Sequence, residues 1–186
     1  MAYRNATYIA FAADGETNPT KSDLKYYNIL RARKELEHTN FNFINAHEKV
    51  SAVRDTSKAD TIRASLRQRI QASKNMLLLL GRTTRLDTDF VPYEINYAVN
   101  ICKLPIIVCY TEEKQPITDY LPLKLRALWP KLLENYINQN KVRTIHIPFR
   151  EAIIQDAINR FNVNNQPLYS TTLYSRELYV TKGIWI

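Results

Sequence analysis

Glycine, cysteine and histidine are scarce in this chain of 186 residues, and each shortage excludes a class of site. The three glycines, Gly15, Gly81 and Gly183, lie too far apart for a GxGxxG fingerprint or a Walker A loop, since each motif needs several glycines close together. Two cysteines and three histidines argue against a structural zinc cluster, and we expect no metal. If this protein handles nucleotides, it does so without the usual glycine loops.

The sequence also has no long apolar run, and we expect no leader segment. The most apolar run, residues 76–80, has the length of a core strand and is far too short to span a membrane. Residues 1–13 do not have the layout of a signal peptide. Cys102 and Cys109 are expected in buried elements, where they would stay unpaired. We therefore expect a reduced, cytoplasmic protein that has no contact with membranes.

The charge balance is positive, with 26 Lys and Arg against 18 Asp and Glu and a net charge of +8. Four basic residues are expected on one helix as a solvated face: Arg63, Arg67, Arg69 and Lys74. Aromatic residues are not interleaved with the basic ones at a spacing that stacks bases, so nucleic-acid binding is weakly supported. The charge suits an anionic nucleotide or an acidic partner better.

Short apolar runs alternate with longer amphipathic stretches, which is typical of βα units. Strands are expected at residues 8–13, 41–45, 76–80, 106–110 and 143–147, with helices at about 22–37, 57–73, from 92 onward and at 151–161. We predict an α/β, flavodoxin-like sheet of five parallel strands in the order 2-1-3-4-5, with helices on both faces.

The domain organisation follows from the same pattern. Residues 1–163 form one domain, in which 111–141 is an irregular insertion with two short helices near 123–128 and 131–137. Residues 164–186 are rich in aromatic side chains and fit no βα unit. We expect this tail to pack on the body or to serve as an assembly surface.

Glu94 is the best candidate for a catalytic residue. In the predicted strand order, the winding reverses between strands one and three, and ligands of such sheets bind beyond the carboxyl ends there. If the next helix opens at Pro92, Glu94 lies in its first turn, where free N–H groups and the helix dipole favour the ionised carboxylate. Such a carboxylate suits stabilising a developing cation or acting as a nucleophile. A purely structural glutamate is the open alternative.

Other polar residues near this edge are candidates for binding substrate, each with an ordinary structural alternative. Asp14 follows strand one and could hold a hydroxyl group or cap its loop. His47, just past strand two, could contact a ligand or lie in an exposed loop. Arg54 could bind phosphate or help to cap the next helix. The loop after strand three adds three more candidates: Gly81, Arg82 and Thr83.

Five segments carry a more specific signal: residues 41–47 (FNFINAH), 53–55 (VRD), 62–70, 75–81 and 90–95 (FVPYEI). In this order they resemble the bacterial TIR-like proteins, and more narrowly the TIR component of Thoeris anti-phage defence systems. The resemblance covers about residues 6–163 and is most specific between 41 and 110.

The resemblance implies a flavodoxin-like fold and cleavage of NAD at the nicotinamide–ribose bond. The family's catalytic glutamate begins the helix after strand three, which here is Glu94, and the aromatic residue before it is Tyr93. The loop after strand one matches at Phe11 and Asp14. It further implies a cyclic or modified ADP-ribose that activates a partner effector, with self-assembly. NAD is then the substrate, and no cofactor is expected.

Two alternatives remain open. A nucleoside deoxyribosyltransferase-like enzyme would also use a glutamate on a flavodoxin-like fold for chemistry at an N-glycosidic bond. A non-enzymatic TIR-type assembly module would use Glu94 only structurally. The chemistry of NAD agrees with the first interpretation, because nicotinamide leaves as a neutral molecule and one carboxylate can steady the ribosyl cation without a general acid.

Overall fold

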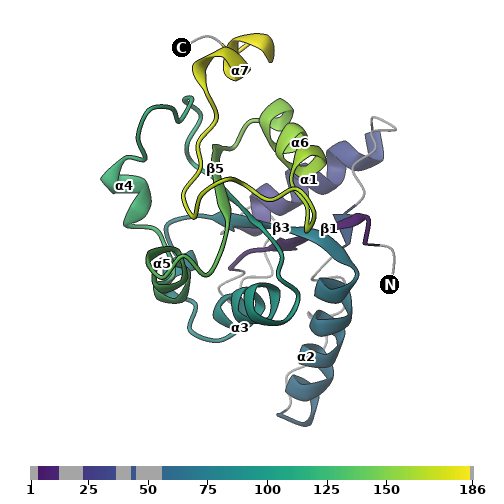
Figure 1. The fold of residues 1–186 in the computed structure, drawn as a ribbon. Helices are drawn as coiled ribbons and strands as arrows, with labels where there is room; N and C mark the ends of the chain where they lie inside the picture. The colour runs from purple at the N-terminus through teal and green to yellow at the C-terminus, as the bar shows by residue number, and fades with distance from the viewer. Residues whose placement is uncertain (1–3, 13–22, 37–42, 45–55, 185–186) are drawn as a thin grey trace.

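The computed structural model of this protein describes residues 4–12, 23–36, 43–44 and 56–184 (Figure 1). Its strands are β1 (Ala6–Ala10), β2 (Phe43–Ile44), β3 (Ser73–Leu80), β4 (Ile106–Tyr110) and β5 (Thr144–Pro148). Its helices are α1 (Leu24–Leu36), α2 (Thr56–Gln71), α3 (Phe90–Asn96), α4 (Leu123–Arg126), α5 (Lys131–Asn138), α6 (Glu151–Arg160) and α7 (Arg176–Thr181). A 3₁₀ turn at Thr84–Leu86 and a π-helix at Tyr97–Ile101 flank α3.

A parallel sheet forms the centre of the molecule. β1 pairs with β3, β3 with β4, and β4 with β5, all in parallel. β2 is two residues long and lies along the other side of β1, with Phe43 opposite Thr7. Parallel neighbours need crossover connections, and helices supply them here. The predicted α/β class, with a parallel sheet and helices, is confirmed.

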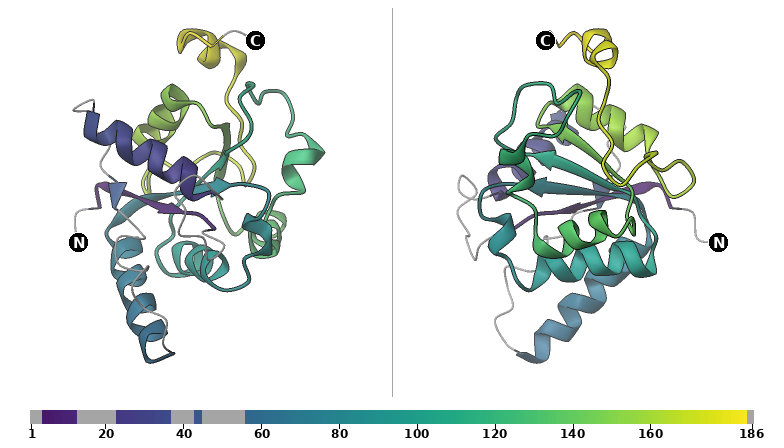
Figure 2. Two further views of the ribbon diagram at one scale, coloured as in Figure 1. Left: turned by 180° about the vertical axis from the view of Figure 1, so that it is seen from behind. Right: turned by 60° about the vertical axis from the view of Figure 1, so that its left-hand side comes forward.

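β3 is buried on both faces. Its residues from Met76 to Leu80 are all 0% exposed. Leu78 and Leu80 belong to the core under α2, α3 and α5, whereas Leu77 and Leu79 belong to the core under α1 and α6. Figure 1 shows these helices on opposite faces, and the right-hand view of Figure 2 shows the sheet between the two layers. A strand covered on both sides has to be apolar throughout.

The start of β3 differs from the prediction. The strand begins at Ser73 rather than at residue 76, although Ser73 and Asn75 are polar. Both are fully buried. The Ser73 hydroxyl donates to the Arg69 carbonyl at 2.8 Å, and the Asn75 amide donates to two carbonyls at the end of α6, at 3.1 and 2.6 Å. These bonds replace water at the Ser73 hydroxyl and the Asn75 amide nitrogen, whereas Oδ1 of Asn75 has no hydrogen-bond partner within the described residues. Lys74 lies in β3 and not, as expected, on the helix.

The segment 111–141 carries the two short helices that the sequence predicts. α4 starts directly after Pro122 and α5 directly after Pro130. Proline suits this place because its fixed φ is compatible with a helix start. α5 buries Leu133 and Ile137 in the same core as α3.

A chain of buried hydrogen bonds connects this segment to the sheet and to the tail. Trp129 Nε1 donates to the Tyr110 hydroxyl, which bonds His146 Nδ1, and His146 Nε2 bonds the Thr144 hydroxyl, each at 2.8 Å. Thr144 then donates to the Ser170 carbonyl at 2.5 Å. Each hydroxyl has one proton, so His146 accepts at Nδ1 and donates at Nε2. Burial lowers the pKa of His146 to about 3, which keeps the ring neutral.

The tail packs on β5 and α6. Thr172 exchanges backbone hydrogen bonds with Thr144 and His146, at 3.0 Å each. Further along the tail, Tyr174 and Tyr179 are buried in the core under α1 and α6. These contacts hold the residues that follow β5 and α6 against the sheet.

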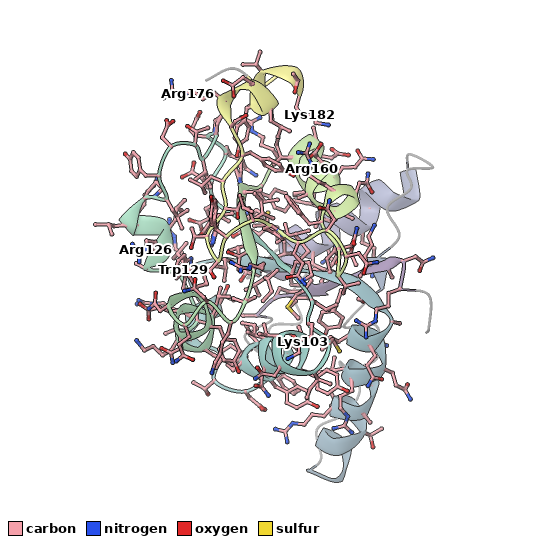
Figure 3. All side chains as sticks on the ribbon, in the orientation of Figure 1. Lys103, Arg126, Trp129, Arg160, Arg176 and Lys182 are labelled. Carbon is pink, nitrogen blue, oxygen red and sulfur yellow. The ribbon has the colours of Figure 1, made fainter. Side chains whose placement is uncertain are left out.

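Asp156 on α6 anchors the end of the chain. It accepts a hydrogen bond from the Tyr174 hydroxyl at 2.7 Å and pairs with Arg160 at 3.2 Å and with Lys182 at 3.0 Å. Figure 3 labels Arg160 and Lys182, which reach this carboxylate from α6 and from the residue after α7. Two cations and a phenol therefore converge on one acid.

We expect Tyr179→Ala to destabilise the protein by about 3–5 kcal/mol, because it removes a fully buried aromatic side chain that joins the tail to the core. Tyr169→Ala is the matched control in the same tail, since its side chain is 62% exposed, and we expect a change within about 0.5 kcal/mol. Urea unfolding followed by circular dichroism measures both. Equal midpoints for the two variants would contradict the packing role.

Candidate functional site

Glu94 lies on α3, but not in its first turn. The helix begins two residues before Pro92, which makes Glu94 its fifth residue. Asp87 binds backbone N–H groups at the start of the helix instead. Its Oδ1 accepts hydrogen bonds from the N–H groups of Asp89 at 2.9 Å and Val91 at 3.4 Å. The prediction that free N–H groups of the helix stabilise Glu94 is therefore wrong.

The Glu94 side chain points from α3 to the sheet and meets Tyr8. The Tyr8 hydroxyl donates a hydrogen bond of 2.5 Å to Glu94 Oε1. Tyr8 is 0% exposed and Glu94 is 1% exposed, and the neighbouring core residues are apolar. Oε2 of Glu94 has no hydrogen-bond partner within the described part of the chain. A carboxyl group with one satisfied and one unsatisfied oxygen thus lies in a hydrophobic layer.

This burial changes the charge state of Glu94. Desolvation raises its pKa to about 8; the Tyr8 hydrogen bond opposes this rise and the charge of Asp87 adds to it. The group is therefore mostly protonated at neutral pH in this conformation. The expectation of an ionised carboxylate is wrong for this state, because the loss of water outweighs the single hydrogen bond that favours the charge.

The Tyr93 side chain contacts α2. Arg67 donates to its hydroxyl at 3.2 Å, and the guanidinium of Arg63 lies 5.5 Å from its ring centroid. Arg63 also pairs with Asp89 at 3.0 Å. Two of the basic residues expected on a solvated face therefore hold α2 against α3, and Tyr93 belongs to that interface.

Phe11 lies on the other face of the sheet. Its ring stacks on Tyr27 of α1 with centroids 4.9 Å apart, in the core under α1 and α6. Tyr8, the partner of Glu94, belongs to the core on the opposite face. The structure therefore does not bring Phe11 and Glu94 together.

Gly81 lies against the start of α1. A Cβ atom added at Gly81 would stand 2.0 Å from Oδ1 of Asp23, so any larger residue would have to displace the Asp23 carboxylate. Asp23 precedes α1 and is 3% exposed; its Oδ2 accepts a hydrogen bond from the Thr84 hydroxyl at 2.6 Å. Thr84 in turn accepts one from the Gly81 N–H at 2.8 Å. This arrangement fastens α1 to the end of β3.

Arg82 and Thr83 follow at the carboxyl edge of the sheet. The Arg82 guanidinium pairs with Glu112 at 2.7 Å, and the Thr83 carbonyl accepts from the Leu86 N–H at 2.8 Å. An open cavity of about 340 Å³ adjoins Arg82. Its lining comes from the ends of β3 and β4 and from α4: Leu80, Gly81, Arg82, Tyr110, Glu112, Glu113, Lys124, Leu125 and Leu128. Arg82 thus reaches a cavity, with its charge balanced by an acid.

Three predicted substrate-binding residues, Asp14, His47 and Arg54, lie outside the described residues. Within the ranges that the structure does describe, no group of three or more His, Cys, Asp or Glu side chains is arranged to hold a metal ion. Cys102 and Cys109 are buried and unpaired, as expected. No helix in the described part of the chain is both long enough and apolar enough to span a membrane.

Sequence reasoning missed three residues of this region. Tyr8 was visible as a tyrosine inside a buried strand, where a phenol needs a hydrogen-bond partner. Asp87 precedes the helix by three residues, which is a position for an acid that serves a helix start. The contact of Asp23 with Gly81 depends on tertiary packing, and no local sequence pattern reports it.

A comparison with known families identifies the chain. The profile of a family described as "Thoeris protein ThsB, TIR-like domain" matches residues 8–116, which is more than half of the sequence. The protein belongs to this family. Tyr8 is the first residue of the matched span, and Gly81 and Glu94 lie inside it. β5, α6 and the tail lie beyond its end, although they pack on the same sheet.

For this Thoeris TIR-like protein, we expect Gly81→Ala to lose about 1–3 kcal/mol of stability, because the new methyl group displaces Asp23. The same substitution made in an Asp23→Ala background should lose less, since the clash is gone. Denaturant unfolding of the four proteins gives the coupling energy. Strictly additive losses would show that the Asp23 contact is not what requires glycine.

The raised pKa of Glu94 predicts a pH-dependent stability. The folded protein keeps a proton up to about pH 8, whereas the unfolded chain releases it near pH 4.5. Stability from this group is therefore fully present below pH 4.5 and falls by roughly 1.4 kcal/mol per pH unit until about pH 8. We expect Glu94→Gln to remove that slope in unfolding measured from pH 5 to 9. Parallel curves for both proteins would refute the buried, protonated state.

Proposed function

We propose that this protein cleaves NAD at the nicotinamide–ribose bond, with Glu94 as the catalytic residue, in anti-phage defence. The observation that carries the proposal is a buried carboxyl group with one unpartnered oxygen, held on the helix after β3. Membership in the Thoeris ThsB TIR-like family supports the defence role. The product that we propose is a cyclic or modified ADP-ribose that activates a partner effector.

The chemistry needs little beyond one carboxylate. The bond between ribose C1′ and the nicotinamide nitrogen breaks, its electron pair stays on nicotinamide, and the cationic ring leaves as a neutral molecule. The positive charge moves to the ribose, where ionised Glu94 would stabilise it. Capture by water gives ADP-ribose and releases a proton. Capture by a group of the same molecule gives a cyclic product, so exclusion of water would decide the outcome.

Two requirements follow for turnover. Glu94 has to be ionised, and a pKa of about 8 leaves roughly a tenth of the molecules in that form at pH 7. Oε2 also has to become accessible, because Glu94 is 1% exposed in this conformation. The described structure thus corresponds to a resting state, and substrate or self-assembly would supply the opening.

The finer structural and cellular predictions belong to the same proposal. The pairing of β2 with β1 supports a five-stranded flavodoxin-like sheet in the order 2-1-3-4-5. Buried, unpaired cysteines support a reduced, cytoplasmic location. The net charge of +8 favours an anionic dinucleotide. We propose no resident cofactor, with NAD as the substrate.

We expect Glu94→Gln to reduce nicotinamide release from NAD by about 100-fold or more. Glutamine is nearly isosteric with the protonated acid and can still accept from Tyr8, so the fold at pH 7 should survive. Glu134→Gln is the control, because Glu134 is a partly exposed acid on α5 that pairs with Lys131. The assay follows nicotinamide by chromatography and the second product by mass spectrometry, with and without phage-derived activators.

The same assay tests the two alternatives. Burial of Glu94 against Tyr8 also suits an assembly module in which this residue is structural. The assembly module is supported if neither the wild type nor Glu94→Gln releases nicotinamide in any condition, while both proteins assemble to the same extent in light scattering. Base exchange on deoxynucleosides without NAD cleavage would instead indicate a deoxyribosyltransferase-like enzyme.

A further inference from the structure

Tyr8 is the sole described residue that hydrogen-bonds the Glu94 carboxyl group. Its hydroxyl donates to Oε1 at 2.5 Å from the third residue of β1, a strand that pairs with β3 along its whole length. The phenol is 0% exposed and lies among the apolar residues under α3. A side chain fixed in this way holds the carboxyl group in one orientation.

The orientation separates the two carboxylate oxygens. Oε1 is bound on the sheet side by Tyr8, whereas Oε2 has no partner in the described part of the chain. A phenol that donates a hydrogen bond stabilises the ionised acid more than the neutral one. Tyr8 itself stays protonated, because burial and the negative charge of Glu94 raise its pKa well above the ordinary value.

Other charged or titratable groups act on the pair from the elements around it. Asp87, before α3, raises the pKa of Glu94. Arg69 on α2 and Tyr93 on α3 act on Tyr8 in opposite directions, Arg69 lowering its pKa and Tyr93 raising it. Neither of them donates a hydrogen bond to Glu94. Direct stabilisation of the charge by a described residue therefore comes from Tyr8.

We infer that Tyr8 is a positioning residue that anchors Oε1 of Glu94 from the sheet, sets the pH at which the carboxylate forms, and presents Oε2 as the oxygen that faces the substrate. The catalytic consequence rests on the proposed NAD cleavage. The structural part, that Tyr8 controls the ionisation of Glu94, stands on the geometry of the pair and is measurable without any substrate.

The first experiment compares the wild type, Tyr8→Phe and Tyr110→Phe. Tyr110 is a buried tyrosine on the same side of the sheet, but its hydroxyl bonds Trp129 and His146. We expect Tyr8→Phe to shift the infrared titration of the Glu94 carboxyl, identified by its loss in Glu94→Gln, upward by about one pH unit or more. Tyr110→Phe should leave the titration in place, although it also loses a buried hydrogen bond.

A second variant covers the case in which Tyr8→Phe does not fold. Site-specific incorporation of 3,5-difluorotyrosine at position 8 keeps the hydroxyl and makes it a stronger donor, so the Glu94 titration should move to lower pH. An unchanged titration in a folded Tyr8 variant overturns the inference. An equal shift in Tyr110→Phe overturns it as well, since the effect would then be general loosening of the core.

Nicotinamide release as a function of pH supplies the catalytic readout. The rise of kcat with pH should move in the same direction and by the same amount as the infrared titration in each Tyr8 variant, with KM for NAD within about twofold of wild type. An infrared shift without any NAD cleavage by wild type would refute the proposed function while leaving the control of Glu94 by Tyr8 established. A pH profile that stays fixed while the titration moves would refute the role of Tyr8 in catalysis.

Discussion

Burial of β3 on both faces is the constraint from which the rest of the structure follows. A strand with six consecutive fully buried residues, Asn75 to Leu80, requires a helical layer on each face of the sheet. α3 belongs to the layer on one face of the sheet. Its packing places Glu94 over β1, where the side chain is 1% exposed. α1 belongs to the layer on the other face, and it starts beside the end of β3. There Asp23 occupies the space that a side chain at residue 81 would need.

The charge state of Glu94 is a consequence of that packing. A carboxyl group in an apolar layer prefers its neutral form. The single hydrogen bond from the Tyr8 phenol replaces only part of the hydrogen bonding that water would provide to the anion. In this conformation the protein thereby holds its candidate catalytic group protonated and covered. Under the proposed function, such a resting state would prevent continuous cleavage of the cell's own NAD.

Periodic patterns in the sequence predicted the α/β class and most element positions, since apolar runs and amphipathic helices report burial directly. The pattern failed where hydrogen bonds within the protein replaced water: Ser73 bonds the preceding helix and Asn75 bonds the end of α6, and both polar residues lie at the start of the central strand. It also failed at α3, where Asp87 starts the helix earlier than Pro92 suggests. The position of Glu94 after β3 made it a candidate from the sequence. Tyr8 was not a candidate, because it contacts a helix residue that is 86 positions away in the sequence, and local spacing does not report such a contact.

The hydrogen-bond chain from Trp129 to Ser170 bears on how this protein folds as a unit. Every donor in it faces one acceptor, so the loss of any member leaves a buried polar group unsatisfied. Its members come from both sides of residue 116, where the family match ends. The buried hydrogen-bond network of this chain therefore extends beyond the span that the family model matches, and it reaches into the tail.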